Sequence, residues 1–255
     1  MSTASTASAT RDPAPAEPRR VVITGVSEGL GLALARAFAA RGAVVAGCAT
    51  DAARLRAVAD ALGPGHLVHV ASVTDEDAMA RFAEEACREG APDLVVANAG
   101  VINPRRPVWE IETAQWRRVL DVNVLGVAIT ARAFLPAMIA AGSGLFVATS
   151  SGWGRSADWG LGPYCASKFA VEGIVDTLRH DLPEGVRAVA LDPGGGINTR
   201  MLAECLPDEH DDYVSPERWG PGAAAYIATT LYAENASGSH TVPDQSAATH
   251  EETAA

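Results

Sequence analysis

The chain has 255 residues, of which 48% are hydrophobic, and a formal net charge of −11. This length suits one large domain or two small ones, and the apolar share is sufficient for a substantial core. The charge is concentrated near the end, because residues 204–255 hold ten acidic residues and one basic residue. The rest of the chain is nearly neutral and lacks the basic patch that binding to a nucleic-acid backbone requires. We therefore expect no nucleic-acid partner.

Cysteine spacing and hydropathy indicate the setting of the protein. The chain has four widely spaced cysteines, Cys48, Cys87, Cys165 and Cys205. This spacing argues against a zinc site and a disulfide framework, and it favours a reducing cytoplasm. The most apolar region, residues 124–141, is interrupted by Arg132 and Pro136, so it falls short of the roughly 20 apolar residues of a membrane span. We expect a cytoplasmic protein with no bound metal and no membrane segment.

The hydrophobic pattern alternates between strands and helices along one domain. Its tails, residues 1–19 and 244–255, are polar, and we expect both to be disordered around a domain at 20–243. In chain order, we expect strands at 20–25, 43–50, 66–72, 93–100, 144–150 and 186–194, and helices at 29–42, 51–62, 75–89, 113–140 and 163–182. This alternation predicts a doubly wound parallel α/β sheet of the Rossmann type. The polar, irregular segment 200–220 is a candidate lid over the substrate.

The segment from Thr24 to Gly31, TGVSEGLG, leaves the first predicted strand and opens the first predicted helix. Its three glycines permit a tight turn and the close approach of a ligand to the backbone. A pyrophosphate could then meet the free amides at the start of the helix. In this context the loop predicts a nucleotide site, although close packing of strand and helix also explains such glycines.

A second motif, SSGWGRSADWGLGPYCASK, spans residues 150–168. Tyr164 and Lys168 are four residues apart in a predicted helix, so they share one face. At about 4 Å and an effective dielectric constant of about 20, an ammonium attracts a phenolate by about 4 kcal/mol. That attraction would lower a phenol pKa near 10 by about three, into the range that acid–base catalysis requires. Ser151, at the end of a strand, can donate a hydrogen bond to a carbonyl oxygen.

In order and spacing, these motifs resemble the short-chain dehydrogenase/reductase family. The segments that carry the likeness are TGVSEGLG at 24–31, NAG at 98–100, DVN at 121–123, Ser151, YCASK at 164–168 and DPGGGINT at 192–199. The resemblance implies hydride transfer between NAD(P)(H) and a small-molecule carbonyl or alcohol. It implies that Tyr164 donates or accepts the proton and that Ser151 polarises the carbonyl. Lys168 would lower the tyrosine pKa and hold the nicotinamide ribose, and Asn123 would fix a water of a proton relay.

The same resemblance places the cofactor along the carboxyl edge of the sheet. Besides Tyr164 and Lys168, the implied contacts are Gly25, Ser27, Glu28, Gly29, Leu30, Gly31, Thr50, Ser72, Val73, Asn98, Ala99, Gly100, Pro193, Gly194, Ile197 and Thr199. Our candidates for the substrate wall are Ile102, Trp153, Trp159 and Tyr213. Ordinary packing in the core or the lid also explains each of these four side chains.

A narrower likeness concerns the substrate and the cofactor. Stretches such as ANAGVINPRRPVWEI and ALDPGGGINTRML are similar to the NADPH-dependent pterin aldehyde reductases of plants and their bacterial relatives, which reduce pterin-6-aldehydes and some aromatic aldehydes. However, Glu28 and Thr50 stand where NADPH-preferring relatives usually carry basic residues. Because a carboxylate repels a 2′-phosphate, we favour NAD(H) over NADP(H).

Two other functions fit the same motifs. The protein could bind a nicotinamide cofactor in a regulatory role without catalysis, or it could use the same tyrosine for isomerisation or dehydration. The family likeness also implies a homodimer or homotetramer, usually formed through the two long helices that hold Asn123 and Tyr164.

Overall fold

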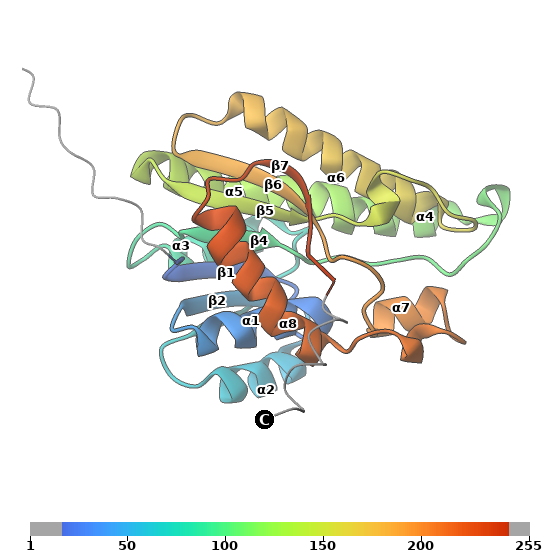
Figure 1. Ribbon diagram of the computed structural model, residues 1–255, viewed down its shortest axis with the longest axis horizontal. Coiled ribbons are helices and arrows are strands. Elements are labelled where there is room, and N and C mark those ends of the chain that lie inside the picture. Colours follow the sequence, from blue (N-terminus) through green and yellow to red (C-terminus); the bar gives the residue numbers. More distant parts are fainter. Residues whose placement is uncertain (1–16, 245–255) are drawn as a thin grey trace, which may run out of the picture.

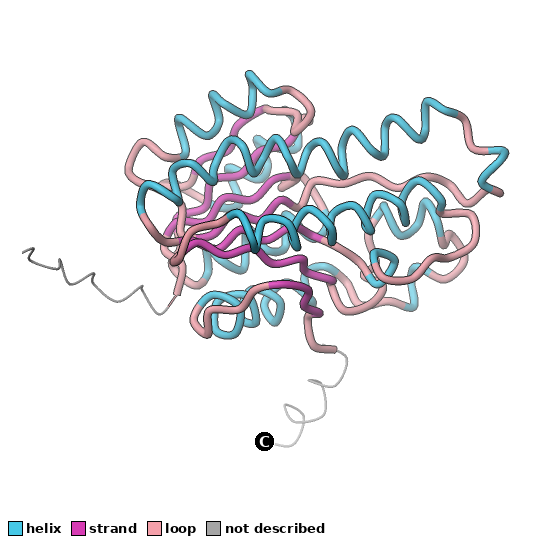
Figure 2. Tube along the Cα trace, turned by 90° about the horizontal axis from the view of Figure 1, so that it is seen from above, coloured by secondary structure: helices cyan, strands magenta, loops and turns pink. Residues whose placement is uncertain are grey.

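The structure is a computed structural model that describes residues 17–244 of the chain. Seven parallel strands form the centre of this part (Figures 1 and 2). The strands are β1 (Arg20–Thr24), β2 (Val44–Ala49), β3 (Leu67–Val70), β4 (Leu94–Ala97), β5 (Gly144–Thr149), β6 (Val186–Asp192) and β7 (Gly238–Thr241). Their order in the sheet is β3-β2-β1-β4-β5-β6-β7. The order reverses between β1 and β4, and a ligand of such a sheet binds beyond the carboxyl ends of the strands at that point. The predicted doubly wound parallel sheet in a single domain is confirmed.

Helices cover both faces of the sheet (Figure 2). One face carries α1 (Gly29–Ala40), α2 (Ala52–Leu62) and α8 (Pro216–Tyr226), and the other carries α3 (Glu76–Ala86), α5 (Gly126–Ala141) and α6 (Gly162–Asp181). Successive strand residues alternate between the two cores, so Val21 and Ile23 pack on the first and Val22 on the second. The inner strands are therefore apolar on both sides, which explains their continuous hydrophobic runs.

One long helical segment, Thr113–Ala141, combines α4 (Thr113–Leu120), a π turn (Asp121–Leu125) and α5. Its 29 residues are long and apolar enough to cross a membrane by length and composition, and 44% of its most apolar stretch is buried. Core helices of soluble proteins meet the same criterion, so this finding is weak evidence for a span. The absence of a membrane segment stays a prediction.

The second half of the domain has more regular structure than we expected. The segment 200–220 is not irregular throughout, because it contains the short helix α7 (Arg200–Cys205) and the start of α8. We also missed β7, a short polar edge strand in which half-buried and exposed residues alternate. At the other end, Arg19 lies in the segment predicted to be disordered, yet its amide donates to Asp93 at 2.8 Å. The remaining tail residues, 1–16 and 245–255, lie outside the described part of the chain.

Candidate active site

The glycine loop between β1 and α1 is tightly packed against the end of β4. A Cβ at Gly31 would lie 2.1 Å from the carbonyl oxygen of Gly25, and Gly25 itself has φ +75° with a Cβ position 2.9 Å from Ala99. The side-chain amide of Asn98 donates to the Thr24 carbonyl at 3.0 Å. Asn98 therefore holds the loop in shape with its side chain, a structural role beside the cofactor contact predicted for it. These positions require glycine because no side chain fits.

The start of α1 is suited to a pyrophosphate. Its N-cap residue, Glu28, makes no side-chain capping bond, so the first amides of the helix are free to meet an anion. Across the crevice, the Cβ position of Gly29 lies 3.4 Å from the side chain of Thr199. The loop and this helix end thus fit the cofactor that the sequence predicts. The carboxylate of Glu28 pairs with two arginines and does not cap the helix.

Two arginines converge on Glu28, which changes the charge at the predicted 2′ end of the cofactor. Arg54 pairs with one carboxylate oxygen of Glu28 and Arg200 with the other, at 2.5 Å for Arg200. Asp51 caps α2 by accepting from the amides of Ala53 and Arg54, as expected for an N-cap residue. The carboxylate that should repel a 2′-phosphate is therefore neutralised, and two guanidinium groups lie beside it.

The other predicted cofactor residues lie at the same edge of the sheet. Thr50 and Ser72 follow β2 and β3, and Ser72 bonds to Thr74 at 2.8 Å, while Val73 is buried under Gly126 of α5. Ser27 is half-buried in the glycine loop. The cavity described below is lined by Leu30, Pro193, Gly194, Ile197 and Thr199 among the predicted contacts.

Ser151 and Tyr164 meet where β5 ends and α6 begins. The Ser151 hydroxyl accepts from the Trp153 amide at 3.2 Å, which caps a short turn, and it also hydrogen-bonds to the Tyr164 hydroxyl. Tyr164 lies in the first turn of α6, and its side chain is buried. Both residues line one cavity, so the structure brings together the predicted acid–base group and the predicted carbonyl donor.

The electrostatics of Tyr164 differ from our prediction. Its pKa is raised, chiefly by burial, which the bond from Ser151 opposes and the nearby Cys205, Asp192 and Cys165 reinforce. Lys168 donates to the Thr149 carbonyl at 2.7 Å, and its Nζ lies 5.4 Å from the centre of the Tyr164 ring. The predicted fall of the tyrosine pKa was wrong because the argument counted the attraction to the ammonium and left out the desolvation of the phenolate.

Asn123 lies in the π turn and is fully buried. Its Oδ1 accepts from the Val101 amide at 2.8 Å, and its Nδ2 donates to the Val101 carbonyl at 2.9 Å and to Ser167 at 3.0 Å. Ser167 in turn donates to the Tyr164 carbonyl at 2.7 Å. The side chain of Asn123 therefore ties the loop after β4 to the backbone of α6.

A cavity of about 400 Å³ lies beside Tyr164. Three of the four predicted substrate residues line it, namely Ile102, Trp153 and Tyr213, and helix α7 closes one side with Met201, Leu202 and Cys205. The Trp153 ring meets Tyr164 edge-on at 5.9 Å. Trp159 was wrongly placed on this wall. The residue is 64% exposed and does not line the cavity.

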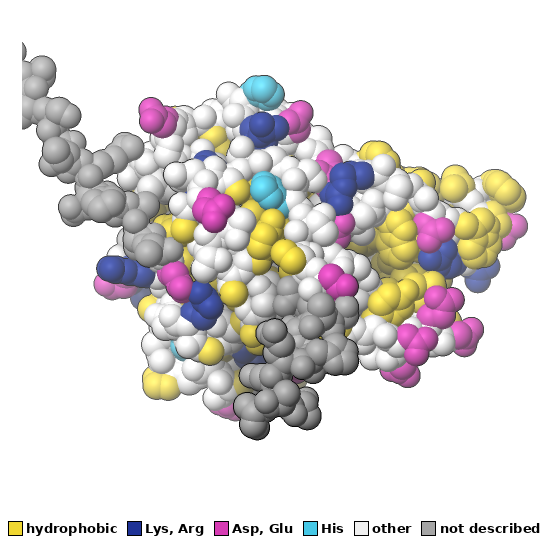
Figure 3. All heavy atoms as spheres, viewed as in Figure 1, with side chains coloured by type: hydrophobic (Ala, Val, Ile, Leu, Met, Phe, Trp, Pro, Cys, Tyr) yellow, Lys and Arg dark blue, Asp and Glu magenta, His cyan; other side chains and the backbone are white. Residues whose placement is uncertain are grey.

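Arg105, in the loop after β4, binds both the loop of Asp158 and Trp159 and the end of helix α7. Its guanidinium donates to the carbonyls of Cys205 at 3.1 Å and Trp159 at 2.7 Å and pairs with Asp158 at 2.8 Å. It also lies 5.8 Å from the centre of the Trp153 ring. Figure 3 shows hydrophobic side chains gathered on the side of the molecule where the loop before α4 and helix α7 project. Arg105 was missed from the sequence because its partners lie 53 to 100 residues away.

The described residues contain no group of three His, Cys, Asp or Glu side chains that could hold a metal ion. His210, which stands in an acidic run, bonds to the Pro207 carbonyl at 2.8 Å. The four cysteines are free thiols.

Comparison with known proteins agrees with this geometry. A family model described as short chain dehydrogenase matches residues 19–210. The NADPH-dependent pterin aldehyde reductase of Arabidopsis thaliana is 40% identical over 220 residues, which cover 85% of this chain and 90% of that protein. A 3-ketoacyl-(acyl-carrier-protein) reductase from Brucella melitensis complexed with NADH is 25% identical and superposes with a TM-score of 0.81, covering 89% of this chain and 98% of that one. A short chain dehydrogenase from Escherichia coli CFT073 complexed with NADPH is also 25% identical, with a TM-score of 0.81 and coverage of 88% and 97%.

Proposed function

The chain belongs to the short chain dehydrogenase family and is an NAD(P)-dependent oxidoreductase of carbonyls and alcohols, and we propose that it reduces an aldehyde on an aromatic or pterin-like ring. The observation that carries this proposal is the meeting of Ser151 and Tyr164 in one apolar-walled cavity beside the glycine loop. The pterin aldehyde reductase relative supports the substrate class. The cavity lining is mostly apolar and includes Trp153 and side chains of α7, which would suit a flat ring.

The state of Tyr164 favours reduction over oxidation. Because burial raises its pKa, the phenol stays protonated near neutral pH and can give its proton to an alkoxide that forms at the carbonyl oxygen. Ser151 donates a second hydrogen bond to that oxygen and fixes its place. When bound, the nicotinamide supplies the hydride. Lys168, whose ammonium lies 5.4 Å from the centre of the Tyr164 ring, would stabilise the phenolate that remains after proton transfer.

For the cofactor, the expectation of NAD(H) is not supported, and NADP(H) is proposed instead. The pterin aldehyde reductase relative is NADPH-dependent, and Arg54 and Arg200 together neutralise Glu28. A 2′-phosphate would replace the Glu28 carboxylate as the partner of the Arg54 guanidinium, and arginine is well suited to phosphate recognition. Replacement of Arg54 by Met should weaken NADPH binding and leave NADH binding unchanged.

A homo-oligomer is part of the proposal. The helices that hold Asn123 and Tyr164 expose large apolar side chains, with Leu125 and Phe169 each 48% accessible. A second copy of the chain would cover this face. Glutamate at Phe169 should then reduce the molar mass measured by light scattering to that of the 26.4 kDa chain. Cytoplasmic location and the absence of a nucleic-acid partner stay predictions.

The direct test measures NADPH and NADH oxidation in parallel against pterin-6-aldehyde and benzaldehyde. We expect turnover with NADPH, and we expect Tyr164→Phe to abolish it while NADPH fluorescence still reports binding. Product formed without net change in nicotinamide absorbance would replace reduction by isomerisation or dehydration. Binding without turnover over a broad panel of aldehydes and ketones would favour a regulatory role.

A further inference from the structure

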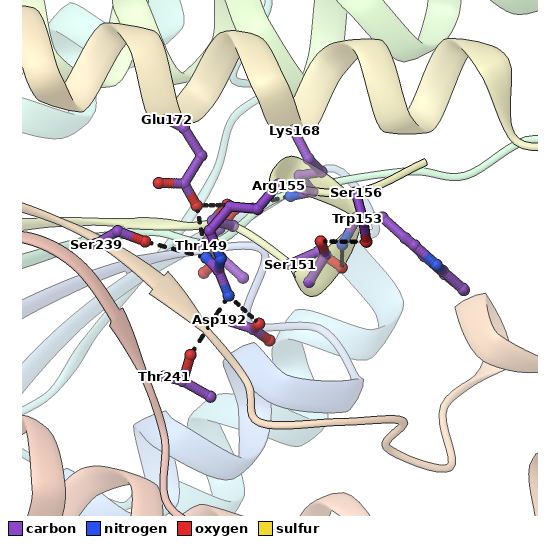
Figure 4. Close-up of polar contacts among 12 residues, drawn as sticks. Thr149, Ser151, Trp153, Arg155, Ser156, Lys168, Glu172, Asp192, Ser239 and Thr241 are labelled. Carbon is purple, nitrogen blue, oxygen red and sulfur yellow. Dashed lines mark hydrogen bonds and ion pairs between the residues drawn. The ribbon is translucent and has the colours of Figure 1, made fainter. Parts of the chain in front are cut away.

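Arg155 follows Ser151 by four residues, and its guanidinium contacts elements from three other parts of the chain (Figure 4). Nη1 donates to Glu172 of α6 at 2.9 Å and to Ser239 of β7 at 3.0 Å. Nη2 donates to Asp192 at the end of β6 at 2.6 Å. One side chain thus joins the loop after β5, helix α6 and the two strands at the edge of the sheet.

Each carboxylate that binds Arg155 also holds a group next to the reacting residues. Glu172 accepts from the hydroxyl of Ser150, the neighbour of Ser151, at 2.5 Å. Asp192 accepts from the amide of Gly194 at 3.1 Å, and Gly194 belongs to the loop that lines the cavity. Arg155 is therefore two hydrogen bonds away from Ser150 on one side and from Gly194 on the other.

The burial of the two carboxylates makes their common partner necessary. The side chain of Glu172 is 17% exposed and that of Asp192 is 10% exposed. Glu172 lies one helical turn after Lys168, and Asp192 lines the cavity with Tyr164. Two carboxylates so close to each other and so poorly solvated repel unless a cation lies between them. The planar fork of an arginine offers a separate nitrogen to each carboxylate, whereas a lysine offers both of them one compact ammonium.

We propose that Arg155 is a positioning residue for the reaction, which fixes Ser151 and the loop of Gly194 by holding Glu172 and Asp192 together. The kinetic part of this inference rests on the proposed function, and the electrostatic part does not. Arg155 touches neither substrate nor cofactor in this role, because it acts through the two carboxylates.

The charges around the two reactive side chains give the inference a specific signature. Glu172 raises the pKa of Lys168. Cys205, Asp192 and Cys165 raise the pKa of Tyr164. Both carboxylates raise the pKa of the group that they face. Without Arg155 the negative charges of the two carboxylates would no longer be neutralised, so the pKa of Lys168 and that of Tyr164 should both rise.

Lys168 can report this change directly because it is the single lysine of the chain. In protein labelled with ¹³C-lysine, one Cε resonance follows its titration. We expect Arg155→Met to raise the midpoint by about half a pH unit or more. The double variant Arg155→Met/Glu172→Gln should return it, since glutamine keeps the acceptor for Ser150 and loses the charge. The control is Arg179→Met, which removes a surface ion pair on the same helix and should leave the midpoint in place.

Kinetics complete the test. We expect Arg155→Met to lower kcat roughly tenfold or more, with a smaller change in NADPH affinity, and Arg155→Lys to recover part of the loss. Equal lysine midpoints in wild type and Arg155→Met, with kcat per NADPH-binding site unchanged, would overturn the inference. If Arg155→Met does not fold, the same comparison is made with Arg155→Lys for kcat and with Glu172→Gln for the midpoint, which should fall. A wild-type protein that turns over no aldehyde would count against the proposed function, whereas the midpoints would still decide the electrostatic claim.

Discussion

Replacement of Lys168 by Met tests the electrostatics at the centre of the site. The lysine is 4% exposed, its ammonium donates to Thr149 at 2.7 Å, and burial lowers its pKa from 10.5 to about 8, with Glu172 opposing the change. Methionine has nearly the same length and carries no charge. The substitution therefore removes the titration and the hydrogen bond and keeps most of the packing.

The sign of the effect on stability follows from this lowered pKa. Between about pH 8 and 10.5 the unfolded chain keeps a proton on the lysine that the folded protein has released, so the free energy of unfolding rises with pH. From pH 7 to pH 9.5 the two pKa values give an increase of about 2 kcal/mol from this residue. The Met variant lacks this term. At pH 7 its stability should be close to that of wild type, because relief from a buried charge offsets the loss of the bond to Thr149.

The assay is urea unfolding of the cofactor-free protein at several pH values between 7 and 9.5. Buried groups such as Cys48, whose pKa burial raises to about 12, titrate in both proteins and cancel in the difference. We expect wild type to gain about 2 kcal/mol relative to Lys168→Met over this range. The ¹³C-lysine resonance gives the folded pKa independently. A midpoint near 10.5 and parallel stability curves would refute the reasoning.

Three further predictions concern the loops and the helix around the site. Ala at Gly31 should weaken NADPH binding at least roughly tenfold in a fluorescence titration, because its Cβ would overlap a carbonyl oxygen, whereas Ala at Gly173, where nothing lies within 4 Å, should slightly stabilise the protein. Arg105→Gln should raise the KM for the aldehyde with NADPH affinity unchanged. The adjacent Arg106, which is exposed, is the control, and equal effects of the two substitutions would contradict the role of Arg105. Asn123→Ala should lower the free energy of unfolding by about 2–4 kcal/mol, measured with urea, because it leaves the partly buried amide and carbonyl of Val101 unpaired.

The sequence was informative where one local pattern determines the structure. The apolar runs of β1 and β5 predict buried parallel strands, and the glycine spacing predicts the turn at Gly25 and Gly31. The pattern failed at β7, because a short edge strand with polar residues on its exposed side resembles a loop. Edge strands need less apolar surface than inner ones, so their signal in the sequence is weak.

The charges of the site could not be predicted in the same way. Tyr164 and Lys168 were correctly placed on one helix face, yet the pKa of each depends on burial, which neighbours far along the chain create. Likewise, nothing near Arg155 indicates Asp192 or Ser239 as a partner, since these lie 37 and 84 residues away. Contacts of this kind depend on the order of strands in the sheet. That order is a property of the whole fold and cannot be predicted from any local stretch of sequence.

Two arginines near the reacting groups explain how loops can form a defined site. Arg105 binds the loop of Trp159 to helix α7, and Arg155 binds the loop of Ser151 to α6 and β6. Both act on the segment between Ser151 and Tyr164, which is rich in glycine and would lose much conformational freedom if a ligand alone had to order it. Because the guanidinium groups order this segment in the free protein, binding energy of the substrate remains for the reaction. Substrate binding and turnover can therefore be changed separately, with Arg105 affecting KM for the aldehyde and Arg155 affecting kcat.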